Sequence, residues 1–401
     1  MKQKLLIIGI VMNSAGTEKS FLSFAEALDY SRFDVDLLLA KKEGDFLSLI
    51  PKEINVIEMP DCGEMFLLSA KNAAKTIFNS LIKKKPWIAF EVFPYFVRLL
   101  CSSGCKRADI ATALWCKLLK YFPSVEKEYD AAVAYWGDRT MFYMVDKVHA
   151  KKKITWLHFD YENPPRDDKI YGRYFSECDH IVTVSSVIDE SLKKHFPSLA
   201  ERCVMIENIN HAAVIHSMAE KGDSFSDHFE GIRILTVGRI SEQKGYDFAV
   251  EALGRLCAEG KNVRWYVLGG GDPVDRDKLL CRAKELGVED RLVFLGTTSN
   301  PYTYMKNCDI YVQPSRHEGR PIAVEEAKIL ARPIVITRYL SANEQLENGK
   351  FGIVCDISTD AVADAISQLI ENPTLRDHFT EVLSAQNFGN EHEIEKFYKL
   401  L

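Results

Sequence analysis

The sequence predicts an α/β protein with two domains, each built on a parallel β-sheet. Short apolar runs alternate with amphipathic helical stretches, a pattern typical of strands joined by helical crossovers. This alternation stops at a polar stretch around residues 208–227 and then restarts. The chain has 401 residues, of which 47% are hydrophobic, so it is long enough to bury two cores.

Each half contains six apolar runs that we interpret as buried strands. In the first half they lie at residues 5–10, 35–39, 131–135, 154–156, 181–184 and 204–206. In the second half they lie at residues 234–237, 265–268, 292–295, 310–312, 333–336 and 352–355. We therefore expect a first domain at residues 1–210 and a second domain at residues 211–385.

Cysteine usage and hydropathy favour a protein of a reducing compartment. Ten cysteines are scattered from Cys62 to Cys355, and the closest pair, Cys101 and Cys105, has no partner pair at zinc-finger spacing. Reduced thiols are therefore expected. The apolar run at residues 5–12 is short for a signal peptide, and we interpret it as the first strand. No run is long enough to span a membrane, so we expect a cytoplasmic protein.

Residues 315–336 combine a predicted anion site with two carboxylates. Pro321 suits the first position of a helix, because its missing N–H costs nothing there, and the helix is expected to run to about residue 331. The free N–H groups at the start of a helix suit a phosphate. Glu318 and Glu326 lie eight residues apart and can bind separate hydroxyl-bearing parts of one ligand, as in a nucleotide sugar. An ordinary capped helix with solvated glutamates is the alternative.

A second motif favours the phosphate interpretation. The strand at residues 234–237 runs into a glycine turn at residues 238–245. This turn carries Arg239, whose fork of donors matches phosphate oxygens, and Lys244, a compact point charge. The two cations together suit a diphosphate leaving group.

With these motifs the chain resembles the retaining glycosyltransferases of family 4, which have the GT-B architecture of two facing Rossmann-like domains. The most specific parts are Gly-Arg-x4-Lys-Gly at residues 238–245 and Glu-x7-Glu from Glu318 to Glu326. Weaker matches lie at residues 269–273, 292–296 and 308–315. The resemblance spans nearly the whole chain and implies that a C-terminal helix, within residues 386–401, packs back on the first domain.

The resemblance also implies the residues of the site. The implied catalytic residues are Arg239, Lys244, Glu318 and His158. The implied donor-binding residues are Gly16, Gly238, Arg239, Lys244, Gly269, Thr298, Glu318, Gly319, Arg320, Pro321, Ile322 and Glu326. By resemblance Glu318 binds sugar hydroxyls and Glu326 binds the ribose. Because protein cations stabilise the leaving group, no metal and no cofactor are expected, and no convincing Asp-x-Asp site is found.

Two of these implied residues lie in the first domain. Gly16 follows the first strand where the family has Gly-Gly, and it retains the close approach of backbone to phosphate, whereas Ala15 replaces the first glycine. His158 follows the strand at residues 154–156 and would point to the donor sugar. A histidine at a strand end is equally often held only by backbone groups.

Residues 66–122 differ from the rest of the chain in charge. They hold ten basic and two acidic side chains, a net charge of +8, whereas the whole chain carries −6. Aromatic residues are interleaved with the cations, and an anionic bilayer attracts this combination. No nucleic-acid-binding motif accompanies the patch, so nucleic acid is not an expected partner. We expect docking on the inner face of the cell membrane, with a solvated helical face as the alternative.

The expected function is retaining transfer of a hexose or N-acetylhexosamine from a nucleotide diphosphate sugar, with UDP as the expected nucleotide. The expected acceptor is a glycan or a lipid-linked glycan of cell-surface polysaccharide biosynthesis. An epimerase or phosphorylase on the same two-domain frame is the main alternative. A dinucleotide-dependent oxidoreductase fits less well, because Val274 replaces the third fingerprint glycine after residues 269–271. A catalytically silent sugar-binding protein would have no need of both cations and both carboxylates.

Overall fold

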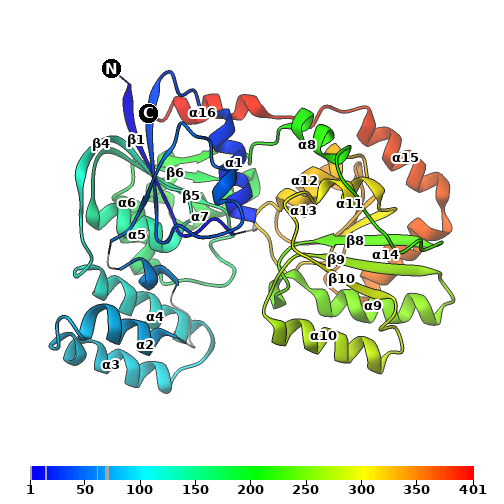
Figure 1. The fold of residues 1–401 in the computed structure, drawn as a ribbon, viewed down its shortest axis with the longest axis horizontal. Coiled ribbons are helices and arrows are strands. Elements are labelled where there is room, and N and C mark those ends of the chain that lie inside the picture. Colours follow the sequence, from blue (N-terminus) through cyan, green and yellow to red (C-terminus); the bar gives the residue numbers. More distant parts are fainter. Residues whose placement is uncertain (1, 14–15, 61, 68–71) are drawn as a thin grey trace. The chain divides into compact units, whose positions relative to one another are not determined.

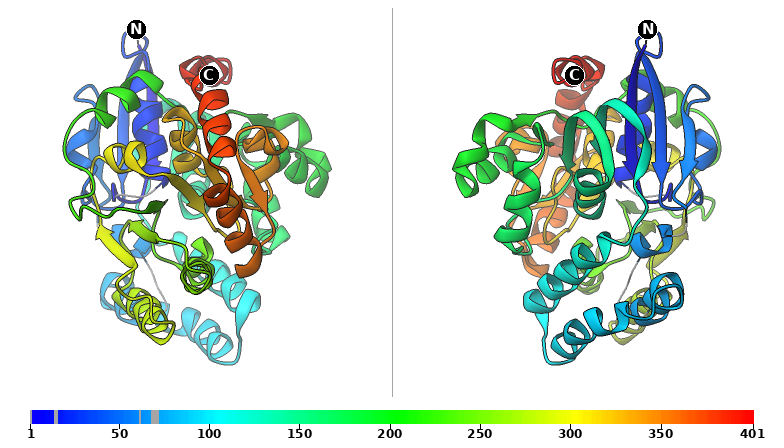
Figure 2. Two further views of the ribbon diagram at one scale, coloured as in Figure 1. Left: turned by 90° about the vertical axis from the view of Figure 1, so that its right-hand side faces the viewer. Right: turned by 90° about the vertical axis from the view of Figure 1, so that its left-hand side faces the viewer.

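The computed structural model of the protein describes residues 2–13, 16–60, 62–67 and 72–401. The chain divides into two compact units. The first unit consists of Met1–Asn13, Ala25–Glu207 and Ile394–Leu401, and the second of Ser14–Phe24 and Asn208–Glu393. Each unit contains one parallel sheet with helices on both of its faces (Figures 1 and 2).

The first sheet has seven strands in the order β3-β2-β1-β4-β5-β6-β7. The strands are β1 (Gln3–Gly9), β2 (Phe33–Leu39), β3 (Asn55–Glu58), β4 (Val125–Ala134), β5 (Val148–Leu157), β6 (His180–Thr183) and β7 (Cys203–Met205). All neighbouring pairs are parallel, and β1 runs beside β2 from Gln3 opposite Phe33 to Gly9 opposite Leu39. The strand order reverses between β1 and β4.

The second sheet has six strands in the order β10-β9-β8-β11-β12-β13. The strands are β8 (Ile232–Val237), β9 (Val263–Leu268), β10 (Leu292–Gly296), β11 (Ile310–Gln313), β12 (Ile334–Thr337) and β13 (Ile353–Cys355). All pairs are again parallel, and the order reverses between β8 and β11. In open parallel sheets such a switch point leaves a crevice at the carboxyl ends of the two strands, where ligands bind.

Helices complete both units. Those that begin before residue 208 are α1 (Gly16–Ala27), α2 (Ala73–Ile77), α3 (Ile88–Leu100), α4 (Gly104–Leu119), α5 (Asp138–Lys147), α6 (Asp168–Ser176) and α7 (Ser186–His195). The later ones are α8 (Ala212–Ala219), α9 (Tyr246–Ala258), α10 (Pro273–Glu285), α11 (Tyr302–Asn307), α12 (Ile322–Ile329), α13 (Ala342–Gln345), α14 (Thr359–Glu371), α15 (Pro373–Ser384) and α16 (Ile394–Tyr398). None of the described helices is long and apolar enough to cross a bilayer.

The twelve expected strands are all present, and one further strand was missed. That strand is β3, an edge strand whose residues are at most half-buried, so it carries no strong apolar run. The strands β4 and β5 begin six residues earlier than expected. The sequence prediction missed these starts because the first six residues of each strand are mostly polar and include only one buried residue.

Three segments, at residues 14–24, 208–210 and 386–393, group differently from the predicted domains. The predicted domain boundaries stay a proposal. Residues 14–24, the start of α1 included, belong to the second unit, where the Ser20 hydroxyl donates to the Asn208 side chain at 2.7 Å. Residues 386–393 also belong to the second unit, where Asn390 accepts a hydrogen bond from the Asn210 backbone at 2.7 Å. The helix α16 packs within the first unit, where the ring of Phe397 lies 6.1 Å from that of Trp156.

Candidate functional site

The two motifs singled out in the sequence lie at the switch point of the second sheet. Residues 238–245 follow β8, and residues 314–321 follow β11, the two strands between which the strand order reverses. Both segments therefore leave the same edge of the sheet, at the place where a ligand crevice is expected. Separate sequence signals thus converge on one site.

Close packing of three loops holds the turn after β8. A Cβ atom on Gly269 would lie 2.1 Å from the carbonyl oxygen of Gly238, and one on Gly245 would lie 2.0 Å from the carbonyl oxygen of Pro314. Gly245 also has a φ of +66°, which favours glycine. These glycines let the turn lie against the loops after β9 and β11. Arg239 at the head of the turn is exposed and has no ion pair among the described residues.

Lys244 and Glu318 form an ion pair at the centre of the site. The Lys244 Nζ lies 2.6 Å from Oε1 of Glu318, and the Ser315 hydroxyl donates to the same oxygen at 2.6 Å. The amide of Gln313 orients the Ser315 hydroxyl from 2.8 Å. Only 8% of the Glu318 side chain is exposed. The contacts with described residues all go to Oε1, so Oε2 keeps its capacity to accept hydrogen bonds.

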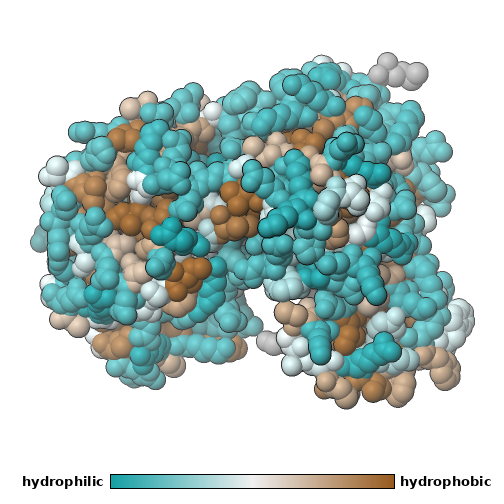
Figure 3. Space-filling model, turned by 180° about the vertical axis from the view of Figure 1, so that it is seen from behind, coloured by the Kyte–Doolittle hydropathy of each residue, from teal (hydrophilic) through white to brown (hydrophobic). Residues whose placement is uncertain are grey.

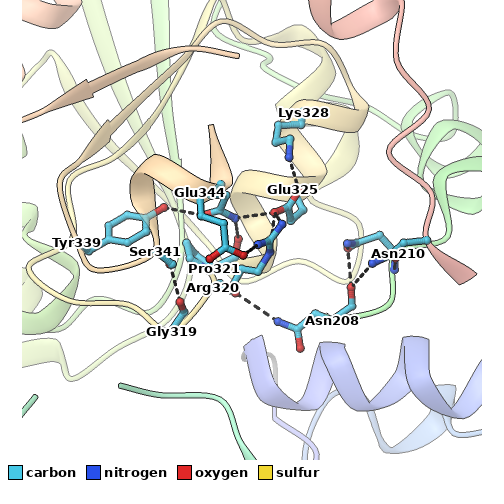
Figure 4. Close-up of polar contacts among 12 residues, drawn as sticks. Asn208, Asn210, Gly319, Arg320, Pro321, Glu325, Lys328, Tyr339, Ser341 and Glu344 are labelled. Carbon is cyan, nitrogen blue, oxygen red and sulfur yellow. Dashed lines mark hydrogen bonds and ion pairs between the residues drawn. The ribbon is translucent and has the colours of Figure 1, made fainter. Parts of the chain in front are cut away.

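Three successive carbonyl groups before α12 are held by side chains (Figure 4). The carbonyl of Gly319 accepts from Ser341 at 2.6 Å, that of Arg320 from Asn208 at 3.3 Å, and that of Pro321 from Gln345 at 3.0 Å.

Two of the anchored carbonyls determine where an amide N–H points, because the peptide after Arg320 ends at Pro321, which has no N–H. Because the C=O and N–H of a trans peptide point in opposite directions, the hydrogen bond to Pro321 directs the N–H of Ile322 away from Gln345. The first N–H groups of a helix have no intrahelical partner and attract anions. The helix α12 begins at Ile322 and ends at Ile329. Pro321 is therefore the residue before the helix, with an extended ψ of 119°, and not its first residue as expected.

A buried network of charged side chains stabilises the loop before α12 (Figure 4). Glu325 accepts from Arg320 at 3.0 Å and from Lys328 at 2.8 Å, and Arg320 also donates to Glu344 at 2.9 Å. The side chains of Arg320, Glu325 and Lys328 are each at most 8% exposed. Burial alone would raise the pKa of Glu325, but the charges of Arg320 and Lys328 hold that pKa below its ordinary value. Arg320 thus stabilises the loop, and its predicted contact with the donor stays a prediction.

Glu326 lies deeper in the same helix, with 2% of its side chain exposed. Its Oε1 accepts from the Tyr302 hydroxyl at 3.0 Å and pairs with Lys19 at 2.5 Å. Its Oε2 is buried and has no hydrogen-bond partner among the described residues. An unsatisfied buried carboxylate oxygen is costly, so this atom suits a ligand that donates hydrogen bonds, such as a ribose hydroxyl.

The remaining predicted residues lie in three places. Thr298 follows β10, and its hydroxyl accepts from the backbone of Asn300 at 3.2 Å. Gly16 is the first residue of α1, and a Cβ atom there would meet nothing within 4 Å, so its own surroundings do not require glycine. Ala15 lies outside the described residues. His158 belongs to the first unit, where its ring packs 4.8 Å from that of Tyr135.

Sequence reasoning missed the residues that support the site. Lys19 and Tyr302 hold Glu326, while Asn208, Ser341 and Gln345 hold the carbonyl groups before α12. Each is a single polar residue far from the two motifs in sequence, so no local pattern could have identified it. Within the described ranges, no group of three or more histidine, cysteine, aspartate or glutamate side chains is arranged to hold a metal ion.

Comparisons with known proteins give the relatives and the fold of this chain. Residues 226–382 match the family described as "Glycosyl transferases group 1". Over 377 residues the chain is 28% identical to the N-acetylgalactosamine-N,N'-diacetylbacillosaminyl-diphospho-undecaprenol 4-alpha-N-acetylgalactosaminyltransferase of Campylobacter jejuni, which covers 93% of this chain and 92% of that protein. Over 257 residues it is 26% identical to an uncharacterized glycosyltransferase of Haemophilus influenzae, which covers 62% of this chain and 69% of that protein. The crystal structure of HepE from Anabaena in complex with UDP shares the fold, with a TM-score of 0.67 at 15% identity over 100% of this chain and 99% of that one.

Proposed function

Because this chain is a glycosyltransferase of the GT-B fold whose residues 226–382 carry the glycosyl transferases group 1 domain, we propose that it moves a hexose or N-acetylhexosamine from a nucleotide diphosphate sugar to a glycan or lipid-linked acceptor. The observation that carries this proposal is the meeting of Lys244, Glu318 and the amide groups before α12 at one switch point. Cations, oriented amides and a carboxylate are the groups that a sugar diphosphate needs.

The proposed chemistry follows from these contacts. As the bond from the anomeric carbon to the diphosphate breaks, negative charge grows on the leaving oxygen. Arg239, Lys244 and the amides at the start of α12 stabilise that charge, which lowers the barrier to transfer. Glu318 holds Lys244 with one oxygen and offers the other to a sugar hydroxyl. The acceptor oxygen forms its bond to the anomeric carbon on the face from which the diphosphate leaves, so the anomeric configuration is retained. The leaving phosphate takes the proton of the acceptor hydroxyl, and the proposal therefore needs no protein nucleophile. Protein cations take the place of a metal ion.

The nucleotide is proposed to be UDP. The buried, unpartnered Oε2 of Glu326 supports a ribose at α12, because two neighbouring hydroxyls can donate to one carboxylate. HepE, which shares the fold, has been crystallised with UDP. The Campylobacter relative is named for transfer to a diphospho-undecaprenol glycan, which supports a lipid-linked acceptor in surface polysaccharide synthesis.

Calorimetric binding of UDP, GDP, ADP, CMP and NAD tests the donor site. Lys244→Ala is expected to weaken UDP binding about tenfold or more, since a charge-assisted contact to phosphate is worth roughly 1.5–3 kcal/mol. Because this change also leaves the carboxylate of Glu318 without its cation, stability must be measured in parallel. The double variant Lys244→Ala with Glu318→Gln removes both charges and is expected to recover stability without recovering affinity.

The results of these binding experiments distinguish the proposed transferase from the alternative functions. Recovery of UDP affinity in the double variant would assign Lys244 to the fold and not to the donor. Selective NAD binding would favour an oxidoreductase. Conversion of a UDP-sugar without any acceptor, and without UDP release, would favour an epimerase; transfer to phosphate would favour a phosphorylase.

A further inference from the structure

The helices α2, α3 and α4 form a lobe of the first unit that exposes large apolar side chains (lower left in Figure 1). Six such side chains on this lobe are 44–86% exposed: Phe78, Trp87, Phe90, Phe93, Val97 and Leu100. Seen from behind in Figure 3, hydrophobic side chains gather along the lower edge of this lobe. Most of the exposed large apolar residues in the described part of the chain are thus concentrated in one short segment.

The helix α3 is apolar on two opposite sides. One side is buried through Ile88 and Val92, which are 0% and 2% exposed. At about 100° per residue, the exposed residues Phe90, Val97 and Leu100 fall within about 80° of one another on the opposite side. The apolar side of a helix is normally buried, so the exposed apolar side of α3 indicates a partner that covers it.

Basic side chains flank this exposed stripe. Lys83, Lys84 and Lys85 lie just before α3, and all three are exposed. Arg98 on α3 and two further basic residues at the start of α4 are exposed as well. Residues 72–122 contain nine basic and two acidic side chains, whereas the whole chain has a net charge of −6. Lys71 of the predicted patch lies outside the described residues.

The partner must therefore be both apolar and anionic. A second copy of the same basic lobe would place like charges against each other, which disfavours a symmetric dimer through this face. An anionic lipid bilayer satisfies both demands, because its headgroups attract the lysines while its acyl boundary takes up the aromatic and leucine side chains. We propose that the exposed side of α3, with the lysines before it, docks the protein on an anionic membrane surface without spanning it. The proposal does not depend on the transferred sugar.

Co-sedimentation with phosphatidylcholine vesicles, with and without phosphatidylglycerol, tests this surface without any activity readout. Phe90→Ser combined with Leu100→Ser is expected to weaken binding at least about tenfold for each side chain removed. Lys83→Gln, Lys84→Gln and Lys85→Gln together are expected to weaken binding to anionic vesicles about a hundredfold, and high salt should mimic them. Leu49→Ser is the matched control, because Leu49 is 48% exposed in the same unit but lies outside the lobe.

All substituted side chains are exposed, so an unchanged denaturation midpoint is expected and shows that each variant is folded. Equal binding of the wild-type protein to neutral and anionic vesicles would overturn the electrostatic part of the proposal. Wild-type binding by the Phe90 and Leu100 variant would overturn the apolar part. A concentration-dependent dimer that is lost in that variant, with no sedimentation on vesicles, would show that a second copy covers the stripe.

Discussion

Replacing Glu325 by glutamine removes the negative charge at the centre of the buried network before and within α12. Arg320 keeps Glu344 as a partner at 2.9 Å, but Lys328 loses its carboxylate at 2.8 Å and stays buried. Its ammonium group keeps only the faces of Phe388 and Phe351, at 4.6 and 5.5 Å, among the contacts of described residues. Glutamine matches glutamate in size, so the change tests charge and not packing.

The expected loss of stability is large. Removing one partner of a buried ion pair costs about 3–5 kcal/mol, and the retained ring contacts favour the lower end, about 3 kcal/mol. For a unit of about 150–250 residues this corresponds to a fall in Tm of about 6–12 °C. Urea denaturation, followed by fluorescence and by circular dichroism so that the second unit's transition can be identified, measures the change.

Two comparison variants make this prediction refutable. Asp356→Asn breaks the surface pair with Arg338, whose side chains are 79% and 51% exposed, and is expected to cost about 1 kcal/mol or less. Glu325→Gln with Lys328→Met removes both charges and is expected to recover most of the stability. If Glu325→Gln costs no more than Asp356→Asn, the network does not stabilise the loop and the reasoning fails.

Two further predictions concern the second unit. Hydrogen bonds from Tyr266 and Arg264 lower the pKa of Asp227 to about 2, although partial burial acts in the opposite direction. Because the pKa of Asp227 is lowered, its ionised carboxylate stabilises the fold above pH 4, and this contribution to the free energy of unfolding is lost as the pH falls toward 2. The urea midpoints of wild type and Asp227→Asn should therefore differ at neutral pH and converge near pH 2. A constant difference across this range would remove Asp227 as the cause. Gly245→Ala should lower the free energy of unfolding by well over 2 kcal/mol, because its Cβ would lie 2.0 Å from the Pro314 carbonyl oxygen. The control Gly260→Ala should lower it by only about 1 kcal/mol, because Gly260 has a similar positive φ of +78° but no atom within 4 Å of an added Cβ. Equal losses of stability in the two variants would show that backbone strain, and not the clash, sets the cost.

The GT-B fold class expected from the sequence is confirmed by the two parallel sheets and by the solved structures that share this fold. The buried strands were predictable because parallel strands covered on both faces are continuous apolar runs. The edge strand β3 was not, since only one neighbour pairs with it and its side chains remain largely accessible.

The candidate site was predictable only in part. The cations of residues 238–245 and the carboxylates of residues 318–326 carry chemistry at a recognisable spacing, and the switch point of the sheet brings them together. Local sequence could not show that Lys244 and Glu318 bind each other, because the contact joins residues 74 positions apart. The burial of Arg320 was equally hidden, since the network that accepts its charge is assembled from α12 and α13.

The anchored carbonyls before α12 indicate that the main chain and the side chains of this loop have different roles. The proposed phosphate contacts come from main-chain amides, and Ser341 and Gln345 set the direction of two of them from outside the loop. Asn208 holds the carbonyl before Pro321, which has no N–H. A main-chain contact is indifferent to the side chain that its residue carries. Side chains that do not anchor the loop can therefore be exchanged to suit a different sugar while the proposed main-chain contacts to the diphosphate stay the same, which gives a chain of this kind a simple route to new donor specificity.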